Sequence, residues 1–468
     1  MRRLARGQVA CAFFWFLVLT VWSSSAAAQG VGDPPADTDS YADACPNPLT
    51  RDWVSRADLK KNSQLTYCVN YTGEALGNVS GGIRPGGIYE GRLEVALDYR
   101  HKNQALWETG VHVSADQIHG RGLSTNYLGN NILTASGNEA ERATRLFTLW
   151  LQEQKEDAIS IRVGQLAADD EFAQSKNGST FVNSTFGWPG ILASDLPSNG
   201  PAYPLATPGV RVSLGPQDGF SLMAAVFNGD PAGRGLGTPQ SRDAGGTAFR
   251  LNDGAFAIVE AAFGRNQKDD DKEAPQAVKL GAWYNTERFA DERFDTAGLS
   301  LANPLSSHLP ARHRGDYGGY VIVDLFFSPK VGRSPEGLGI FARVAASPSD
   351  RNLVSFYADG GLTWTGVRDT EGYQKDVVGL GLAYAGIGDD ARALDRDARF
   401  FGGIGHPIRD HEASLELTYV CQMRGWAVQP DLQFIFHPGG HVPDPTDPTK
   451  QRAIRDAVVV GLRSMISF

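Results

Sequence analysis

The sequence lacks any long hydrophobic run beyond its first thirty residues. No stretch there approaches the roughly 18–20 apolar residues that a membrane-spanning helix needs. The mean hydropathy of the chain is −0.27, which excludes a multi-helix membrane protein. A hydrophobic content of 41% nevertheless excludes a disordered chain.

Basic clusters and cysteine are also scarce. Lys and Arg number 44 against 53 Asp and Glu, a net charge of −9, and no Lys/Arg stripe is present. Nucleic-acid binding depends on such a stripe, so no nucleic acid is expected as a partner. Four cysteines in 468 residues exclude a disulfide scaffold.

The first 28 residues have the three parts of a secretory signal peptide. Arg2, Arg3 and Arg6 precede an apolar stretch at residues 10–22, and three alanines at 26–28 offer a cleavage site. That stretch is short for a membrane anchor, the alternative reading. Cleavage leaves 41 basic and 53 acidic residues, a charge of −12. Residues 29–64 are expected to form an N-terminal periplasmic or lumenal segment, with a short helix near 50–59, ahead of one domain at 65–468.

That domain has apolar residues at a period of two. In residues 91–99, Leu93 and Leu97 share one side while Glu94 and Asp98 share the other. Such alternation predicts strands with one apolar and one polar face. The pattern recurs at residues 107–118, 159–163, 209–215, 278–285, 320–327, 355–364, 377–384, 412–421, 426–436 and 456–468.

Short and long connections join these strands. Short ones occur at residues 100–104, 154–157 and 424–425. Long ones, rich in Gly, Pro, Asn and Asp, occur at 120–142, 166–208, 228–246, 288–314, 365–375 and 387–410. About sixteen strands are expected from Leu65 onward, with the weakest strand pattern at residues 248–251.

An even number of ten-residue strands, joined by short turns at one end and long loops at the other, is typical of outer-membrane barrels. The sequence therefore predicts an all-β fold: a transmembrane antiparallel β-barrel with short periplasmic turns and long extracellular loops, in the outer membrane of a Gram-negative bacterium. A soluble sandwich or propeller would need buried strand faces or a blade repeat, and no repeat is seen.

The last strand supports this prediction. Val460, Leu462 and Ile466 share one face with the terminal Phe468. A terminal aromatic on an alternating strand resembles the signal by which outer-membrane proteins are recognised for assembly. Barrel-assembly machinery, outer-membrane lipid and lipopolysaccharide are therefore expected partners.

Several sequence segments carry a family resemblance. The most specific is W-A-V-Q-P-D-L-Q at residues 426–433, followed by P-G-G at 438–440. Others are Y-T-G-E at 71–74, G-Q-L at 164–166 with D-E-F at 170–172, F-N-G-D-P at 227–231 and G-A-W-Y at 281–284. These segments resemble the carbohydrate-selective porins of the OprB family, although Val54-Ser55 stands where that family has Gly-Gly. The resemblance implies a sixteen-stranded outer-membrane channel for passive uptake of sugars, glucose above all, without a cofactor.

A sugar is a neutral polyol with one apolar face, so a selective pore needs hydrogen-bonding charges of both signs and an aromatic surface. The candidates are the residues on the polar side of each strand. The basic ones are Arg92, Arg162, Arg211, Lys279, Arg343 and Arg463, and the aromatic ones are Trp283 and Tyr320. The acidic ones are Glu94, Asp98, Asp116, Glu260, Asp324, Asp359, Glu416 and Asp431. This mixture suits small neutral sugars better than phosphate, although each residue has the alternative role of a solvated wall residue.

The connector at residues 166–208 is the one expected to fold into the lumen. Its Phe172, Phe181, Phe186 and Trp188 either contact sugar or pack as a plug. Pro430 cannot donate a ladder hydrogen bond, so a β-bulge is predicted there.

Three cysteines remain after cleavage of the signal peptide. Cys45 and Cys68 are a candidate disulfide pair, and Cys421, on the lipid side of its strand with Tyr419, is expected to be an inert thiol.

Catalytic and metal motifs are missing. H-E-A-S-L at 411–415 lacks the second histidine of H-E-x-x-H, and no G-x-S-x-G, Walker A or C-x-x-C motif occurs. Neither an enzyme nor a metal site is expected. The open alternatives are a general or anion-preferring diffusion porin, a barrel adhesin, and a barrel enzyme with its catalytic groups on the wall.

Overall fold

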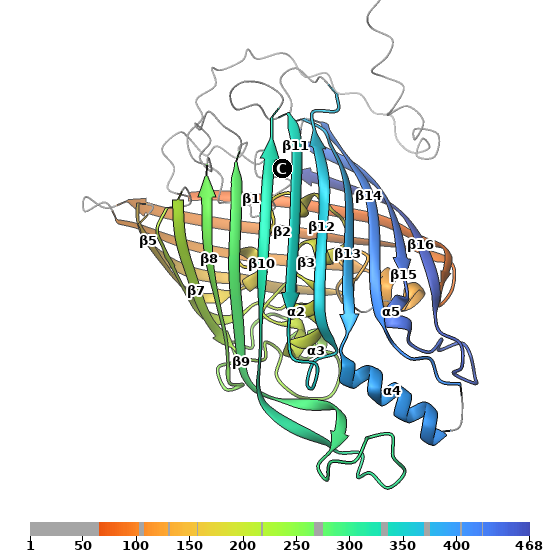
Figure 1. Ribbon diagram of the computed structural model, residues 1–468. Helices are drawn as coiled ribbons and strands as arrows, with labels where there is room; N and C mark the ends of the chain where they lie inside the picture. Colours follow the sequence, from red (N-terminus) through yellow and green to blue (C-terminus); the bar gives the residue numbers. More distant parts are fainter. Residues whose placement is uncertain are drawn as a thin grey trace, which may run out of the picture.

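Sixteen antiparallel strands form a closed barrel, in which each strand pairs with its sequence neighbours and β1 pairs with β16 (Figure 1). The computed structural model describes residues 65–102, 107–129, 132–156, 158–216, 219–265, 275–328, 336–368, 375–402, 405–423 and 425–468. The predicted signal peptide, the segment at 29–64 and its helix lie outside these residues. The prediction of an all-β, sixteen-stranded barrel beginning at Leu65 is confirmed.

The first eight strands are β1 (Leu65–Gly82), β2 (Gly86–Lys102), β3 (Trp107–Gly120), β4 (Ala143–Lys155), β5 (Ile159–Leu166), β6 (Thr207–Leu214), β7 (Gly219–Asn228) and β8 (Ala255–Arg265). The second eight are β9 (Gln276–Asp295), β10 (Pro310–Phe327), β11 (Gly337–Ala346), β12 (Val354–Thr365), β13 (Val377–Ile387), β14 (His411–Met423), β15 (Trp426–Phe436) and β16 (Arg455–Ser467). No helix of the described residues is long and apolar enough to cross a membrane.

Residues that alternate in the sequence lie on opposite faces of the barrel wall. On β2, Val95, Leu97 and Tyr99 are exposed on the outside, whereas Ala96 and Asp98 are buried inside. Because successive side chains on a strand point to opposite faces, an alternating sequence yields an apolar exterior and a polar interior.

The barrel closes where the two ends of the described chain meet. Glu74 on β1 lies opposite Arg463 on β16 in the strand register, and Arg463 Nε donates to Glu74 Oε1 at 2.6 Å. The backbone N–H of Phe468 donates to the carbonyl of Val69 at 3.0 Å. The last residue of the chain therefore completes the seam between β16 and β1.

Connections differ at the two ends of the barrel. In an antiparallel meander, every second connection lies at the same end, so residues 365–375 share the end of the short turns at 154–157 and 424–425. This connection, between Thr365 and Val377, is as long as predicted, but it lies at the end of the barrel where only short turns were expected. At the other end, β9 and β10 extend further than predicted, which leaves only residues 296–309 between them. Residues 248–251 form no strand, because β8 begins at Ala255.

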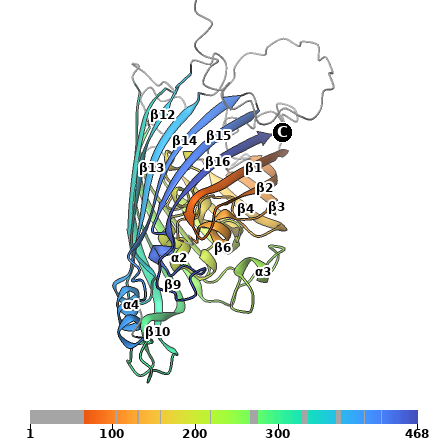
Figure 2. The same ribbon diagram turned by 90° about the vertical axis from the view of Figure 1, so that its right-hand side faces the viewer.

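Among the described residues, the long-loop end carries the α-helices α3 (Pro239–Arg242), α4 (Asp389–Gly402) and α5 (Pro438–His441). Figure 2 shows α4 beside the lower ends of β9 and β10, beyond the rim formed by the other strands. Arg293 of β9 pairs with Asp397 of α4 at 2.9 Å. This ion pair fastens α4 to the barrel.

The predicted bulge at Pro430 was wrong. The pairing of β14 with β15 lapses between Thr418↔Asp431 and Cys421↔Val428, but the register is the same on both sides of the gap. Pro430 also keeps its place opposite Leu462 on β16. Proline lacks a donor N–H, so it interrupts the ladder without adding the extra residue that a bulge requires.

The cysteines occupy different environments. Cys421 is not in a disulfide, and Arg368 Nη2 donates to its sulfur at 3.3 Å. Cys68 is fully buried and disulfide-bonded. Cys45 lies outside the described residues, so the Cys45–Cys68 pairing stays a prediction.

Candidate functional site

The interior of the barrel is occupied by the chain between β5 and β6, here called the inserted segment (residues 167–206). It contains the turns η3 (Ala168–Asp170), η4 (Gly178–Thr180), η5 (Ser184–Phe186) and η6 (Pro197–Asn199), together with α2 (Gly190–Asp195). Side chains of the segment pack against the inner face of the wall. The prediction that this connector folds inward is confirmed.

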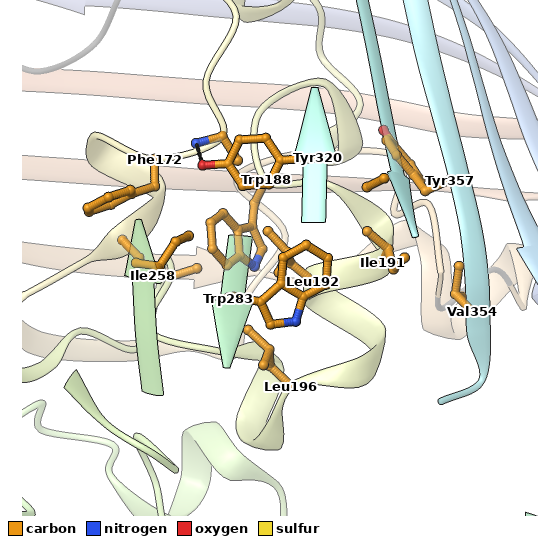
Figure 3. Close-up of a cluster of buried hydrophobic side chains, with 14 of the residues drawn as sticks. Phe172, Trp188, Ile191, Leu192, Leu196, Ile258, Trp283, Tyr320, Val354 and Tyr357 are labelled. Carbon is orange, nitrogen blue, oxygen red and sulfur yellow. Dashed lines mark hydrogen bonds between the residues drawn. The ribbon is translucent and has the colours of Figure 1, made fainter. Parts of the chain in front are cut away.

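An apolar cluster holds the segment against one side of the wall (Figure 3). Phe172, Phe186 and Ile191 of the segment are fully buried, and they belong to the same cluster as Trp283 and Tyr320 of the wall. The Trp283 and Tyr320 rings stack with their centroids 6.4 Å apart. Trp283 and Tyr320 were predicted to face sugar, but their rings pack against the inserted segment.

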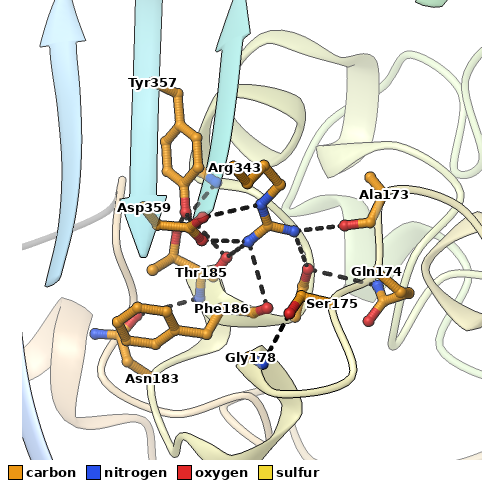
Figure 4. A network of polar contacts seen from close by, with 12 residues as sticks. Ala173, Gln174, Ser175, Gly178, Asn183, Thr185, Phe186, Arg343, Tyr357 and Asp359 are labelled. Carbon is orange, nitrogen blue, oxygen red and sulfur yellow. Dashed lines mark hydrogen bonds and ion pairs between the residues drawn. The ribbon is translucent and has the colours of Figure 1, made fainter. Parts of the chain in front are cut away.

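Arg343 of β11 is the central polar anchor of the segment (Figure 4). Its guanidinium donates to the carbonyls of Ala173 at 2.5 Å, Thr185 at 2.6 Å and Gly187 at 2.9 Å, and it pairs with Asp359 of β12. A guanidinium has five N–H donors in a fixed fork, so one side chain can hold several loop carbonyls at once. Arg343 is thereby wholly occupied by protein groups.

Three predicted acidic residues accept hydrogen bonds from the segment. Glu416 accepts from the backbone N–H groups of Val182 at 2.6 Å and Asn183 at 2.9 Å. Asp324 accepts from the Ser175 hydroxyl at 2.6 Å, and Glu260 accepts from the Ala173 N–H at 3.0 Å. Hydrogen bonds to charged groups contribute about 1.5–3 kcal/mol each. These carboxylates therefore fix the backbone of the segment.

Three predicted basic residues also contact the segment. Arg211 pairs with Glu171 at 2.6 Å, and Arg162 lies 3.5 Å from the same carboxylate. Lys279 Nζ donates to the carbonyl of Gln174 at 3.0 Å and lies 3.4 Å from Glu260. Glu171 thus joins two arginines of neighbouring strands to the inserted segment.

The remaining acidic candidates pair along the wall. Asp98 lies 3.0 Å from the Nδ1 of His112, and Asp431 accepts from Gln433 at 2.8 Å. Asp116 and Glu94 both pair with Arg92, at 2.8 Å and 3.3 Å. Asp98 and Asp116 are thus paired with groups on an adjacent strand, whereas Glu94 and Asp431 have partners on their own strand.

An open cavity of about 240 Å³ remains between the segment and strands β1, β2 and β16. Of the sixteen predicted pore-lining residues, Arg92, Glu94 and Arg463 line it. The Arg92 guanidinium lies 4.3 Å from the centre of the Tyr203 ring, and Arg463 Nη2 donates to the carbonyl of Val182 at 3.3 Å. The rest of the lining is supplied largely by polar and aromatic groups: Asn70, Thr72, Asn138, Phe147, Asp169, Asp170, Gln174, Phe181, Asn183, Ser184, Trp188 and Tyr203.

The predicted set did not include the carboxylates on the segment side of this cavity. Asp169 accepts from the Tyr203 N–H at 2.9 Å, and enclosure within the barrel raises the pKa of Asp169 to about 6. Asp170 lies beside it in the lining. Asp170 belongs to the D-E-F block that carried the family resemblance, and that block is the sequence feature that could have identified it. Strand alternation could not, because both residues lie in a loop.

Comparison with known proteins agrees with this architecture. A family model described as carbohydrate-selective porin, OprB family, matches residues 87–468. The high-pH structure of Pseudomonas putida OprB superimposes with a TM-score of 0.72 at 20% identity, covering 86% of this chain and 94% of that one. This likeness shows a common fold.

Two other solved structures resemble the chain more weakly, with TM-scores below 0.5. The low-pH structure of Pseudomonas putida OprB has a TM-score of 0.48 at 15% identity, covering 86% of this chain and 93% of that one. A mutant of the Rh. blastica porin has a TM-score of 0.44 at 9% identity, covering 86% of this chain and 100% of that one. No curated protein matches the chain. The family match spans most of the sequence and includes fifteen of the sixteen strands, so the chain belongs to the carbohydrate-selective porins of the OprB family.

Proposed function

We propose that the protein is an outer-membrane porin through which small neutral carbohydrates, of the glucose type, diffuse passively. The observation that carries this proposal is the cavity beside the inserted segment, in which charges of both signs and aromatic rings face one space. A water-filled lumen narrowed by a folded-in segment gives each solute a short region of close contact with protein.

The lining matches the chemistry of a sugar. Arg92 and Arg463 can donate to hydroxyl oxygens, while Glu94 and Asp170 can accept from hydroxyl hydrogens. Tyr203, which is partly exposed, offers an aromatic ring to the face of a pyranose. These contacts are few, which suits a channel, since conduction requires release as well as binding.

The balance of charge argues against an anion-preferring porin. Arg92 and Arg463 are both held by acidic partners, and Asp169 and Asp170 add two further carboxyl groups to the lining. A phosphate or carboxylate solute would favour a ring of positive charge instead. The lining therefore supports a neutral solute.

The exterior fits a lipid environment. Outward side chains such as Leu97, Val163 and Leu280 form an exposed apolar surface around the barrel, as expected for contact with outer-membrane lipid and lipopolysaccharide. The exposed ring of Phe468 stands at the end of β16, where barrel-assembly machinery would bind it. No catalytic role is proposed for the polar groups inside.

Single-channel recording in planar bilayers tests the proposal. Purified protein should give discrete conductance steps, and added glucose should reduce the ion current in a saturable way. Phosphate and acetate at equal concentration serve as controls. The assignment to sugars is wrong if phosphate or acetate blocks the current and glucose does not, and a preparation without channel events would indicate an adhesin or structural barrel.

A further inference from the structure

Three of the nine histidines meet around one carboxylate at the long-loop end of the barrel. Asp410 ends the β13–β14 connector, and His411 is the first residue of β14. His437 follows β15, and His441 ends α5. One ligand atom from each of Asp410, His411 and His437 lies within 4.8 Å of the others.

The imidazoles all direct a nitrogen toward Asp410. The Nδ1 atom of His437 lies 3.0 Å from Asp410 Oδ1, and that of His411 lies 3.5 Å from the same oxygen. His441 Nδ1 lies 3.8 Å from Asp410 Oδ2. The His437 and His441 rings are nearly parallel, with centroids 4.0 Å apart, and the His411 and His437 centroids are 4.5 Å apart.

The backbone fixes this arrangement. The Asp410 N–H donates to the carbonyl of Gly440 at 3.1 Å, and the Asp410 carbonyl accepts from Ile387 at 2.8 Å. The His437 N–H donates to Asp456 at 2.9 Å. The ring of His411 stacks on that of Tyr384 at 5.0 Å. The four donor groups are thus positioned by the start of β14 and by the β13–β14 and β15–β16 loops, which contacts with β13 and β16 hold in place.

One carboxylate can neutralise only one imidazolium well, so three protonated histidines at these distances would repel one another. Neutral imidazoles instead present lone pairs, and imidazole with carboxylate is a donor set that suits zinc and neighbouring transition metals. The side chains of Asp410, His411, His437 and His441 are 29–37% exposed, so an ion can reach them.

We propose that Asp410, His411, His437 and His441 bind one divalent transition-metal ion of the zinc class. Tetrahedral zinc with bonds of about 2.0–2.1 Å needs donor atoms roughly 3.4 Å apart. The donor atoms of Asp410, His411 and His437, which lie within 4.8 Å of one another, must therefore draw together on binding. The His441 ring must also turn out of its stack on His437 to direct a nitrogen at the ion. The ion ties the β13–β14 loop to the β15–β16 loop. This site is independent of the proposed sugar pathway. An H-E-x-x-H motif could not indicate it, because its donors come from the β13–β14 connection, the start of β14 and the β15–β16 connection.

Zinc titration of the purified, detergent-solubilised protein tests the site. The protein carries a purification tag without histidine and is first stripped with a chelator. Calorimetry and elemental analysis should give one zinc per chain, and cobalt substitution should give the visible absorption of a tetrahedral nitrogen–oxygen site. His411→Ala and His437→Ala should each weaken zinc binding about tenfold or more. The matched control is His308→Ala, which changes an exposed loop histidine bonded to the carbonyl of Leu301.

A thermal measurement gives an independent readout. Zinc should raise the unfolding temperature of the unmodified protein and leave that of the His411→Ala/His437→Ala variant unchanged. The proposal is overturned if the unmodified protein binds no zinc, or if the double variant binds zinc with the same stoichiometry and affinity. Should the double variant fail to fold, His441→Gln and Asp410→Asn replace it, and unchanged zinc affinity in both would overturn the proposal equally.

Discussion

Arg343 on β11 and Asp359 on β12 form an ion pair in which neither side chain is exposed to solvent. The same guanidinium donates to backbone carbonyls of the inserted segment. A residue predicted to face a sugar is therefore fully engaged in holding the structure that narrows the barrel.

Replacing Arg343 should release the inserted segment. In Arg343→Met, the unpaired Asp359 stays buried and several loop carbonyls lose their donor, so the free energy of unfolding should fall by about 3–5 kcal/mol. Single-channel conductance should rise as the segment withdraws from the lumen. Chemical denaturation and bilayer recording measure the two effects. The Arg343→Met/Asp359→Leu variant removes both charges and should recover part of the stability, and an unchanged conductance in both variants would contradict an anchoring role.

The apolar contacts of the inserted segment should also be needed to hold it against the barrel wall. Phe186 is fully buried, with its ring 4.5 Å from that of Phe181 and 6.1 Å from that of Phe341. Phe186→Ala should destabilise the packed segment by about 3–5 kcal/mol through the cavity it leaves. Hydrogen exchange across residues 167–206 reports this loss. Phe220→Ala, at an outward side chain that is 62% exposed, is the control and should leave exchange in the segment unchanged.

Among the residues that line the cavity, Arg92 is the one whose replacement should most weaken sugar binding. It lies over Tyr203 and is oriented by Asp116 and Glu94. Removing its donors in Arg92→Gln should weaken glucose block of the ion current about five- to tenfold, equivalent to about 1–1.5 kcal/mol. Arg234→Gln, at an exposed outer-loop arginine paired with Glu287, should leave the block unchanged. Equal effects of the two substitutions would argue against a sugar contact at Arg92.

The ion selectivity of the pore should depend on pH through Asp169. Burial raises the pKa of Asp169 to about 6. The group is therefore charged at pH 7 and protonated at pH 5, so the lining loses a negative charge as the pH falls. Reversal potentials in a salt gradient should show weaker cation preference at pH 5 than at pH 7. Asp169→Asn should flatten this dependence, and a variant with the same pH profile as the unmodified protein would exclude Asp169 as its source.

The disulfide prediction has a direct test. Cys68 is buried and disulfide-bonded, and Cys45 is the predicted partner. Mass spectrometry of an unreduced digest should find the two cysteine-containing peptides linked, and reduction should separate them. Cys421 should be alkylated only after unfolding, since it is only 6% exposed. A Cys68 peptide linked to anything other than Cys45 would disprove the pairing.

Strand content and barrel closure could be predicted from the sequence because they depend on local patterns. The alternation of Val95 and Leu97 with Ala96 and Asp98 specifies a two-faced strand wherever it occurs. A strand with one apolar face and no soluble core to cover it belongs in a barrel facing lipid. The terminal Phe468 directly follows β16, and its N–H bonds to Val69 at the closing seam.

The roles of the inward residues could not be predicted in the same way. Arg92 and Arg343 have the same inward strand phase, yet one lines an open cavity and the other is buried beneath the inserted segment. The difference depends on where residues 167–206 lie, and that position results from contacts with strands far away in the sequence, such as Val182 with Glu416.

Strand geometry alternates at every residue, so local pattern was enough to predict which side of the wall a strand residue faces. Which inward groups remain open to solute depends on long-range packing, because the inserted segment covers some of them and leaves others beside the cavity. The tertiary structure also brought His411, His437 and His441 around Asp410, since neighbouring strands and two loops converge there. The spacing of His437 and His441, with three residues between them, is one that metal ligands use, but it did not indicate that Asp410 and His411 lie beside them.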